Sequence, residues 1–201
     1  GNHRVRMVDT NGMISTIIGT GVAGNNAVIS AKGQATTTFN GDGIPGTGTK
    51  LSNPKGLAVD AEGNVYVADT GNHRILKWDG AKKTTFTVVG ICCSASSNTN
   101  LSSADGVTRI TATTYGEGLA ANMVKLSSPQ GVAVAGIGNI YIADTGNHTI
   151  RKVSADMSSV ITIAGQNPEI GVTYPAGTSF AGYAGDSCWA VVTRLSSQTN
   201  V

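Results

Sequence analysis

The feature that most constrains this 201-residue chain is internal repetition. The string GNH begins at Gly1, Gly71 and Gly146. A glycine followed by an acidic residue lies 30 residues before the second and third of these strings, whereas the distance from each GNH to the next such pair is 40, 45 or 39 residues. A block of constant length joined to a block of variable length is typical of a repeat protein with exposed loops between its structural units.

The constant block has the alternation of short β-strands. In the second repeat we expect strands at 56–60, 64–69, 73–79 and 86–90, and in the third at 131–134, 139–144, 148–153 and 160–165. The first repeat contributes the last two strands, at 3–8 and 15–19. Short turns join these strands, so each repeat predicts a four-stranded antiparallel sheet in an all-β protein.

Composition narrows the functional classes. Charged residues are 13% of the chain, the net charge is +2, and no run of Lys or Arg, such as the pair at 82–83, is longer than two. A protein that binds nucleic acid needs a concentrated basic surface, so we do not expect a nucleic-acid partner. No apolar stretch is long enough for a membrane span, and no signal peptide is recognisable.

The motif itself resembles a known family. Residues 54–77 and 129–152 follow the pattern P-x-G-[LV]-A-V, then G-N-[VI]-Y-[VI]-A-D-T-G-N-H, which resembles the NHL repeat. The insertion around 39–43 is similar to the GDGG-type loops of secreted or surface NHL arrays. The resemblance implies a β-propeller of four-stranded blades around a channel. Departures from the pattern are Ala135, Thr149 and Gln198.

This chain provides about two full blades and two partial ones. We divide it into a partial blade with an insertion loop at 1–50, a full blade with a long variable loop at 51–125, a full blade with an insertion loop at 126–194, and the start of another blade at 195–201. Because each sheet needs neighbours on both faces, we expect completion by more of a longer polypeptide or by neighbouring subunits.

The first candidates for metal binding or acid-base catalysis are the polar residues of the repeated motif. They are His3, His73 and His148, with Asp69, Asn72, Asp144 and Asn147. Residues that recur at the same place in every blade do not converge on one centre, so we expect a structural role. The aspartates would accept backbone N–H groups in the Thr-Gly-Asn turn, and the histidines would donate to a neighbouring strand or blade.

Other candidate sites are weaker. The acids of the glycine-acid pairs, Asp42, Glu117 and Asp186, could bind Ca²⁺ with help from backbone carbonyls, or could close simple Asx-type turns. The resemblance brings in propeller lyases and hydrolases that use zinc or calcium, but their catalytic residues find no match here. We therefore expect no catalytic residue, no metal and no cofactor.

Cysteines and sequons bear on location. Cys92 and Cys93 are adjacent, so a disulfide would join one of them to Cys188; three reduced thiols are the alternative. Asn100 and Asn147 each begin an N-glycosylation sequon, and Asn100 lies in the more exposed type of loop.

Two functions remain open. One is a non-enzymatic extracellular or cell-surface propeller that binds protein or glycan, or assembles into a larger structure such as a fibre. The alternative is a metal-dependent lyase or hydrolase with its site in the channel, partly outside this segment. Stoichiometric zinc or calcium in the folded protein would distinguish the second from the first.

Overall fold

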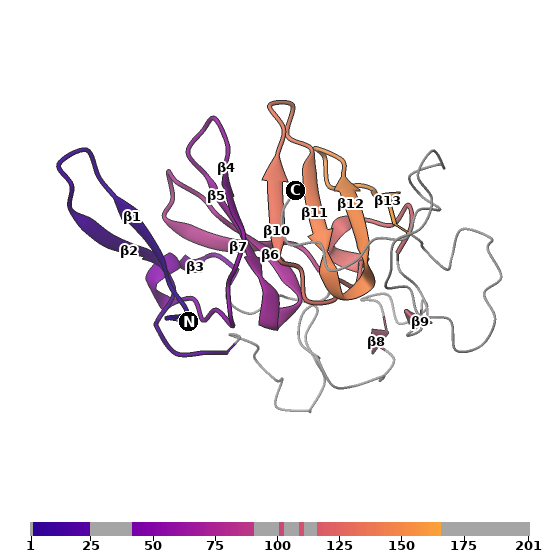
Figure 1. The fold of residues 1–201 in the computed structure, drawn as a ribbon, viewed down its shortest axis with the longest axis horizontal. Helices are drawn as coiled ribbons and strands as arrows, with labels where there is room; N and C mark the ends of the chain where they lie inside the picture. Colours follow the sequence, from indigo (N-terminus) through magenta and orange to yellow (C-terminus); the bar gives the residue numbers. More distant parts are fainter. Residues whose placement is uncertain (1, 25–41, 91–100, 103–108, 111–115, 166–201) are drawn as a thin grey trace.

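The computed structural model describes residues 2–24, 42–90, 101–102, 109–110 and 116–165. Every pair of neighbouring strands in its four sheets is antiparallel. Figure 1 shows three groups of strands fanned out side by side in chain order. The predicted all-β architecture of propeller blades is confirmed, with two full blades and a partial one among the described residues.

The blades are named by their strands. Blade 1 consists of β1 (Val5–Val8) and β2 (Ile14–Ile18). Blade 2 has the order β3-β7-β6-β5-β4, with β3 (Ile44–Pro45), β4 (Leu57–Val59), β5 (Val65–Asp69), β6 (Arg74–Trp78) and β7 (Thr84–Val89). Blade 3 has the order β10-β11-β12-β13, with β10 (Gly131–Val134), β11 (Ile140–Asp144), β12 (Thr149–Val153) and β13 (Val160–Ala164).

Smaller elements complete the description. The 3-10 turns are η1 (Gly46–Gly48), η2 (Thr70–Asn72), η3 (Ala121–Met123) and η4 (Thr145–Asn147). A short pair, β8 (Leu101–Ser102) with β9 (Arg109–Ile110), lies in the variable loop.

The ends of the two loops that precede blades 2 and 3 each lie between two blades, which the sequence did not predict. β3 is a fifth strand that pairs with β7, while Gly19 at the end of blade 1 donates its N–H to the Gly46 carbonyl at 3.0 Å. The equivalent bond in the next repeat joins the Gly90 N–H to the Ala121 carbonyl at 3.1 Å. The loop end therefore connects each blade to the next through backbone hydrogen bonds.

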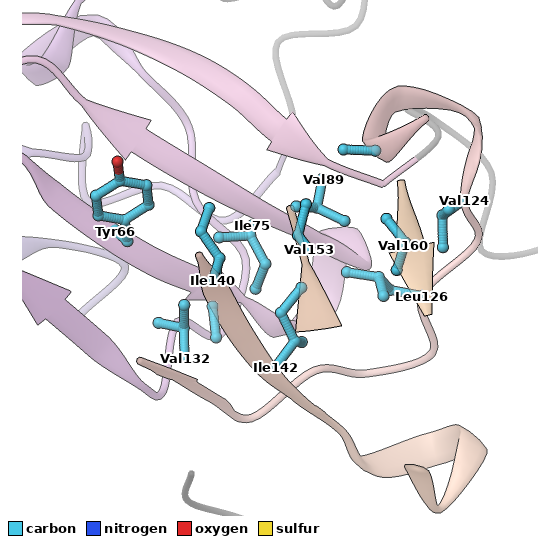
Figure 2. Packing of buried hydrophobic residues seen from close by; sticks show 12 residues of the cluster. Tyr66, Ile75, Val89, Val124, Leu126, Val132, Ile140, Ile142, Val153 and Val160 are labelled. Atoms are coloured by element: carbon cyan, nitrogen blue, oxygen red, sulfur yellow. The ribbon is translucent and has the colours of Figure 1, made fainter. Parts of the chain in front are cut away.

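Packing between blades explains why β5 reads as a continuous apolar run. All five of its residues are buried, because alternate side chains of a strand point to opposite faces. Val65 and Val67 pack in a cluster shared with blade 1, and Tyr66 and Ala68 pack in a cluster shared with blade 3. Figure 2 shows the second cluster, in which Tyr66 and Ile75 of blade 2 face residues of blade 3 such as Ile140.

A β-bulge recurs at the same repeat position in all three blades. The register shifts between Val5 and Arg6, between Ile75 and Leu76, and between Ile150 and Arg151. Opposite the bulge in blade 2, a side chain at Gly90 would lie 2.8 Å from the His73 carbonyl oxygen, and φ of Gly90 is +112°. The bulge and glycine hold the start of β6 against the end of β7, next to the GNH turn.

Candidate functional site

The aspartate of each repeat is the centre of the GNH turn, by which we mean residues 69–73 in blade 2 and 144–148 in blade 3. Asp69 is fully buried; its Oδ1 accepts the Ser52 N–H at 2.7 Å and its Oδ2 accepts the Asn72 side-chain amide at 2.7 Å. Asp144 makes the same two contacts with Ser127 and Asn147, both at 2.7 Å. The aspartate thus fixes its own turn and the start of its own repeat.

The expected partners of the aspartates differ in detail from the observed ones. We expected them to accept backbone N–H groups within the Thr-Gly-Asn turn, but the backbone donors are Ser52 and Ser127, each 17 residues upstream. Gly71 and Gly146 explain this choice, because a side chain at either glycine would collide with the serine that packs against it. The serine segment therefore lies directly on the turn.

Blade 2 contains a buried ion pair at this position. Arg74 Nε lies 2.8 Å from Asp69 Oδ2, and the two side chains are 2% and 0% exposed. Arg74 Nη1 also donates to Thr87 Oγ1 at 3.2 Å on β7. A buried pair with additional hydrogen bonds of this kind is costly to break, because one charge would remain buried without its partner.

Blade 3 places its arginine differently. Thr149 occupies the position of Arg74, and Arg151, two residues further along β12, is completely buried at the position of Leu76. Arg151 Nη2 lies 3.4 Å from Glu117 Oε1. Asp144 has no hydrogen bond from the guanidinium like the one that Asp69 receives, and burial is the main cause that raises its pKa to about 6.

Sequence reasoning noted Thr149 as a departure from the repeat but missed Arg151. The signal was present in the repeat itself, because a charged residue stands where the preceding repeat has a buried leucine. Aligning the two repeats position by position would have identified a displaced arginine in the core.

The acids of the glycine-acid pairs bind the outer strand of the blade that follows. Asp42 Oδ1 accepts the Thr87 N–H at 2.7 Å, and Glu117 accepts the Thr162 N–H at 3.0 Å and also the Thr162 hydroxyl. Burial raises the pKa of Asp42 above 3.8. This is a bond between loop and strand rather than an Asx-type turn. Asp186 lies outside the described residues, and calcium binding stays a prediction.

The histidines accept hydrogen bonds rather than donating them. Asn53 donates its backbone N–H to His3 Nδ1 at 3.1 Å, and Ser128 donates its N–H to His73 Nδ1 at 2.9 Å. In both cases the donor belongs to the next repeat, so the expected contact across blades is present with donor and acceptor exchanged. Among the described residues, the buried Nδ1 of His148 has no hydrogen-bond partner.

The remaining predicted residues divide between described and undescribed parts of the chain. Asn147 uses its side-chain nitrogen to bond Asp144, and Thr149 of its sequon is buried, so a glycan there would disrupt the turn. Asn100, Cys92, Cys93 and Cys188 lie outside the described residues.

Within the described part of the chain, no group of three or more His, Cys, Asp or Glu side chains is arranged to hold a metal ion. The same residues include no helix long and apolar enough to cross a membrane.

Comparison with known proteins gives matches at the positions of the two complete repeats. The family model described as "NHL repeat" matches residues 51–78 and 126–153. A curated relative, NHL repeat-containing protein 2 of Gallus gallus, is 34% identical over 113 residues, which are 56% of this chain and 12% of that protein. The chain thus spans about an eighth of the length of this relative.

Comparison with solved structures gives two matches from Bacteroides thetaiotaomicron. One is described as an auxiliary nutrient binding protein; it is 16% identical, covers 100% of this chain and 37% of its own, and has a TM-score of 0.50. The other, a structural genomics protein of unknown function, is 19% identical with a TM-score of 0.47, over 79% of this chain and 30% of its own. At these identities the likeness concerns the fold alone. The two segments that match the NHL repeat form successive four-stranded blades, so the chain contains two NHL repeats.

Proposed function

We propose that this chain is part of a non-enzymatic, extracellular or cell-surface NHL propeller that acts as a scaffold for protein or glycan interaction and for assembly. The family and the blade architecture support the interaction role, and one observation carries the assembly role: residues at equivalent repeat positions differ sharply in exposure.

The difference concerns the side of each blade that faces the preceding repeat. Val132 on β10 is 6% exposed because blade 2 covers it, whereas its equivalent Leu57 on β4 is 56% exposed. Val153 on β12 of blade 3 is fully buried, whereas its equivalent Val8 on β1 of blade 1 is 62% exposed. Burying an aliphatic side chain of this size contributes about 1.5–3 kcal/mol, so the exposed set has a strong tendency to bind an apolar surface.

The open surface consists of Leu57 and Val59 on β4 together with the free edge of β1. We call it the N-terminal face. In blades 2 and 3 the strand equivalent to β1 pairs on both sides, whereas β1 pairs with β2 alone among the described strands. Its geometry continues the interface between blades 2 and 3, so the partner that fits it is the inner strand pair of an NHL repeat, from either more of a longer polypeptide or a neighbouring subunit.

Peptide binding tests this proposal directly. A peptide with the sequence of residues 53–72, which contains β4 and β5, should bind the chain saturably in calorimetry, because it offers an inner strand pair. Leu57→Asp in the chain should abolish binding by placing a charge on the N-terminal face.

The matched control is Ile137→Asp, since Ile137 is exposed in blade 3 but lies away from the N-terminal face. That variant should bind the peptide as the unchanged chain does. A folded chain that fails to bind, or equal loss of binding in both variants, would contradict the assembly role.

The proposed location outside the cell has separate support. The Asn100 sequon lies in a stretch rich in Ser and Thr, and the same long loop carries Cys92 and Cys93. Both features suit an oxidising, secretory environment.

A further inference from the structure

The histidine of the GNH turn lies at the boundary between repeats. The Nδ1 atom of His73 accepts the Ser128 N–H at 2.9 Å, and the Nδ1 atom of His3 accepts the Asn53 N–H at 3.1 Å. An imidazole nitrogen accepts a hydrogen bond only when it carries no proton, so both rings must be neutral with the proton on Nε2. Each bond therefore depends on the protonation state of one side chain.

Both partners of each bond have left-handed backbone conformations. φ is +49° at His3 and +54° at His73, and it is +48° at Asn53 and +47° at Ser128. Non-glycine residues adopt this region at a cost and keep it where surrounding contacts hold them there. The same backbone conformation recurs on both sides of two successive boundaries, so the hydrogen bond is a repeated structural feature of the contact between repeats.

Neighbouring bonds show that the joint is compact. Thr70, in the same turn as His73, donates its hydroxyl to the Pro129 carbonyl at 2.6 Å. Pro129 follows Ser128, so a single dipeptide of blade 3 receives one bond from the turn and gives another to it.

We propose that the GNH histidines are acid-sensitive joints between successive blades. Protonation of Nδ1 places an N–H group directly opposite the N–H of the next repeat. The hydrogen bond is then lost, two donors face each other, and the left-handed residues on both sides lose the contact that holds them.

The direction of the pH effect follows from the position of the ring. Burial lowers the pKa of His73 below 6.5. The unfolded or undocked chain therefore binds more protons than the docked one when the pH falls below 6.5, and the joint weakens over that range. Above 6.5 the full contribution of the joint is present.

The charged groups nearest to His73 in the chain lie on its own turn and strand and on the facing repeat. On its own turn and strand, Asp69 and Arg74 form the buried ion pair. On the facing repeat, Asp144 accepts the N–H of Ser127, next to Ser128, and Lys125 lies three residues before Ser128. Burial alone accounts for the shift at His73, so the ring responds to desolvation rather than to one of these charges.

His148 has the same turn and the same φ of +54°, and its buried Nδ1 has no hydrogen-bond partner among the described residues. The position equivalent to Ser128 in the next repeat is Ser197, which lies outside the described residues, so the test concerns His73.

The experiment uses the full 201-residue chain. Histidine ring nitrogens are followed by long-range ¹H–¹⁵N NMR from pH 8 to pH 5, and urea unfolding is measured at pH 7.5 and pH 5.5. We expect His73 to be neutral at pH 8 with the proton on Nε2 and to titrate below pH 6.5. A histidine that stays neutral when folded raises the unfolding constant by at most about tenfold between these two pH values.

The variant His73→Asn separates the joint from other titrations. Its side-chain oxygen can accept the Ser128 N–H, asparagine tolerates the left-handed conformation, and the side chain does not titrate. This variant should lose most of the tenfold effect. If His73 titrates at or above pH 6.5 in the unchanged chain, or if His73→Asn keeps the full acid sensitivity, the proposal is wrong.

Discussion

At the scale of single residues, the buried aspartates of the two repeats differ in how the nearest arginine is placed. Asp69 forms a direct ion pair with Arg74 in blade 2. In blade 3 the buried arginine is Arg151, which forms an ion pair with Glu117 instead of Asp144. A longer acid at position 117 than at Asp42 accompanies this displacement. The same buried aspartate therefore sits in two environments within one chain.

This difference predicts that replacing the aspartate by asparagine destabilises blade 2 much more than blade 3. Asp69→Asn leaves Arg74 buried without its counter-ion and should cost about 3–5 kcal/mol of unfolding free energy at pH 7. Asp144→Asn removes a buried charge whose pKa is about 6, so its cost should stay within about 1 kcal/mol. Urea unfolding of both variants measures this.

The pH dependence provides the check on the second variant. Because the folded pKa of Asp144 is above 3.8, its ionised form destabilises the fold by about 3 kcal/mol above pH 6, and this penalty disappears as the pH falls toward 3.8. Asp144→Asn should lack that component. Equal costs for the two variants at pH 7 would show that the aspartates share one environment.

At the scale of elements, sequence periodicity located the strands to within two residues. The expected strand at 131–134 coincides with β10, and the one at 86–90 begins two residues late compared with β7. Periodicity worked because each strand is buried on alternating faces by its two neighbours. It failed for β3, since a two-residue strand made of Ile44 and Pro45 has no period to detect.

The site was predictable in part for the same reason. Repetition identified the GNH turn and its structural use, because residues that recur with the fold serve the fold. It could not identify Asn53 and Ser128 as partners of His3 and His73, since those bonds join backbone groups 50 and 55 residues away in the sequence. A backbone N–H donor is present in every residue except proline, so the amino-acid sequence does not reveal which one donates the bond.

Equivalent positions on β4 and β10 provide a stability prediction. Val132→Asp places a charge between blades 2 and 3. Because an unpaired buried charge is costly, this variant should lose at least about 3 kcal/mol of unfolding free energy or fail to fold. Leu57→Asp should change stability by less than about 0.5 kcal/mol, because its site is open to solvent. Thermal unfolding compares the two, and a large loss in Leu57→Asp would mean that the N-terminal face is covered.

At the scale of the whole molecule, the described blades form a row in which each covers the next (Figure 1). Val132 and Ile140 are buried between blades 2 and 3, whereas Leu57 and Val59 are exposed at the N-terminal face. Repeat proteins derive stability from such nearest-neighbour interfaces, so a blade without its neighbour retains binding capacity. The central claim is that this capacity is specific for another NHL repeat.

Hydrogen exchange along β1 tests that claim most directly. In the 201-residue chain alone, amide groups on the free edge of β1 should exchange much faster than their equivalents on β6 and β12, which pair on both sides. Addition of the peptide with the sequence of residues 53–72 should slow exchange along β1 and leave β12 unchanged. Protection of β1 equal to that of β12 without the peptide, or no slowing when it is added, would contradict the claim.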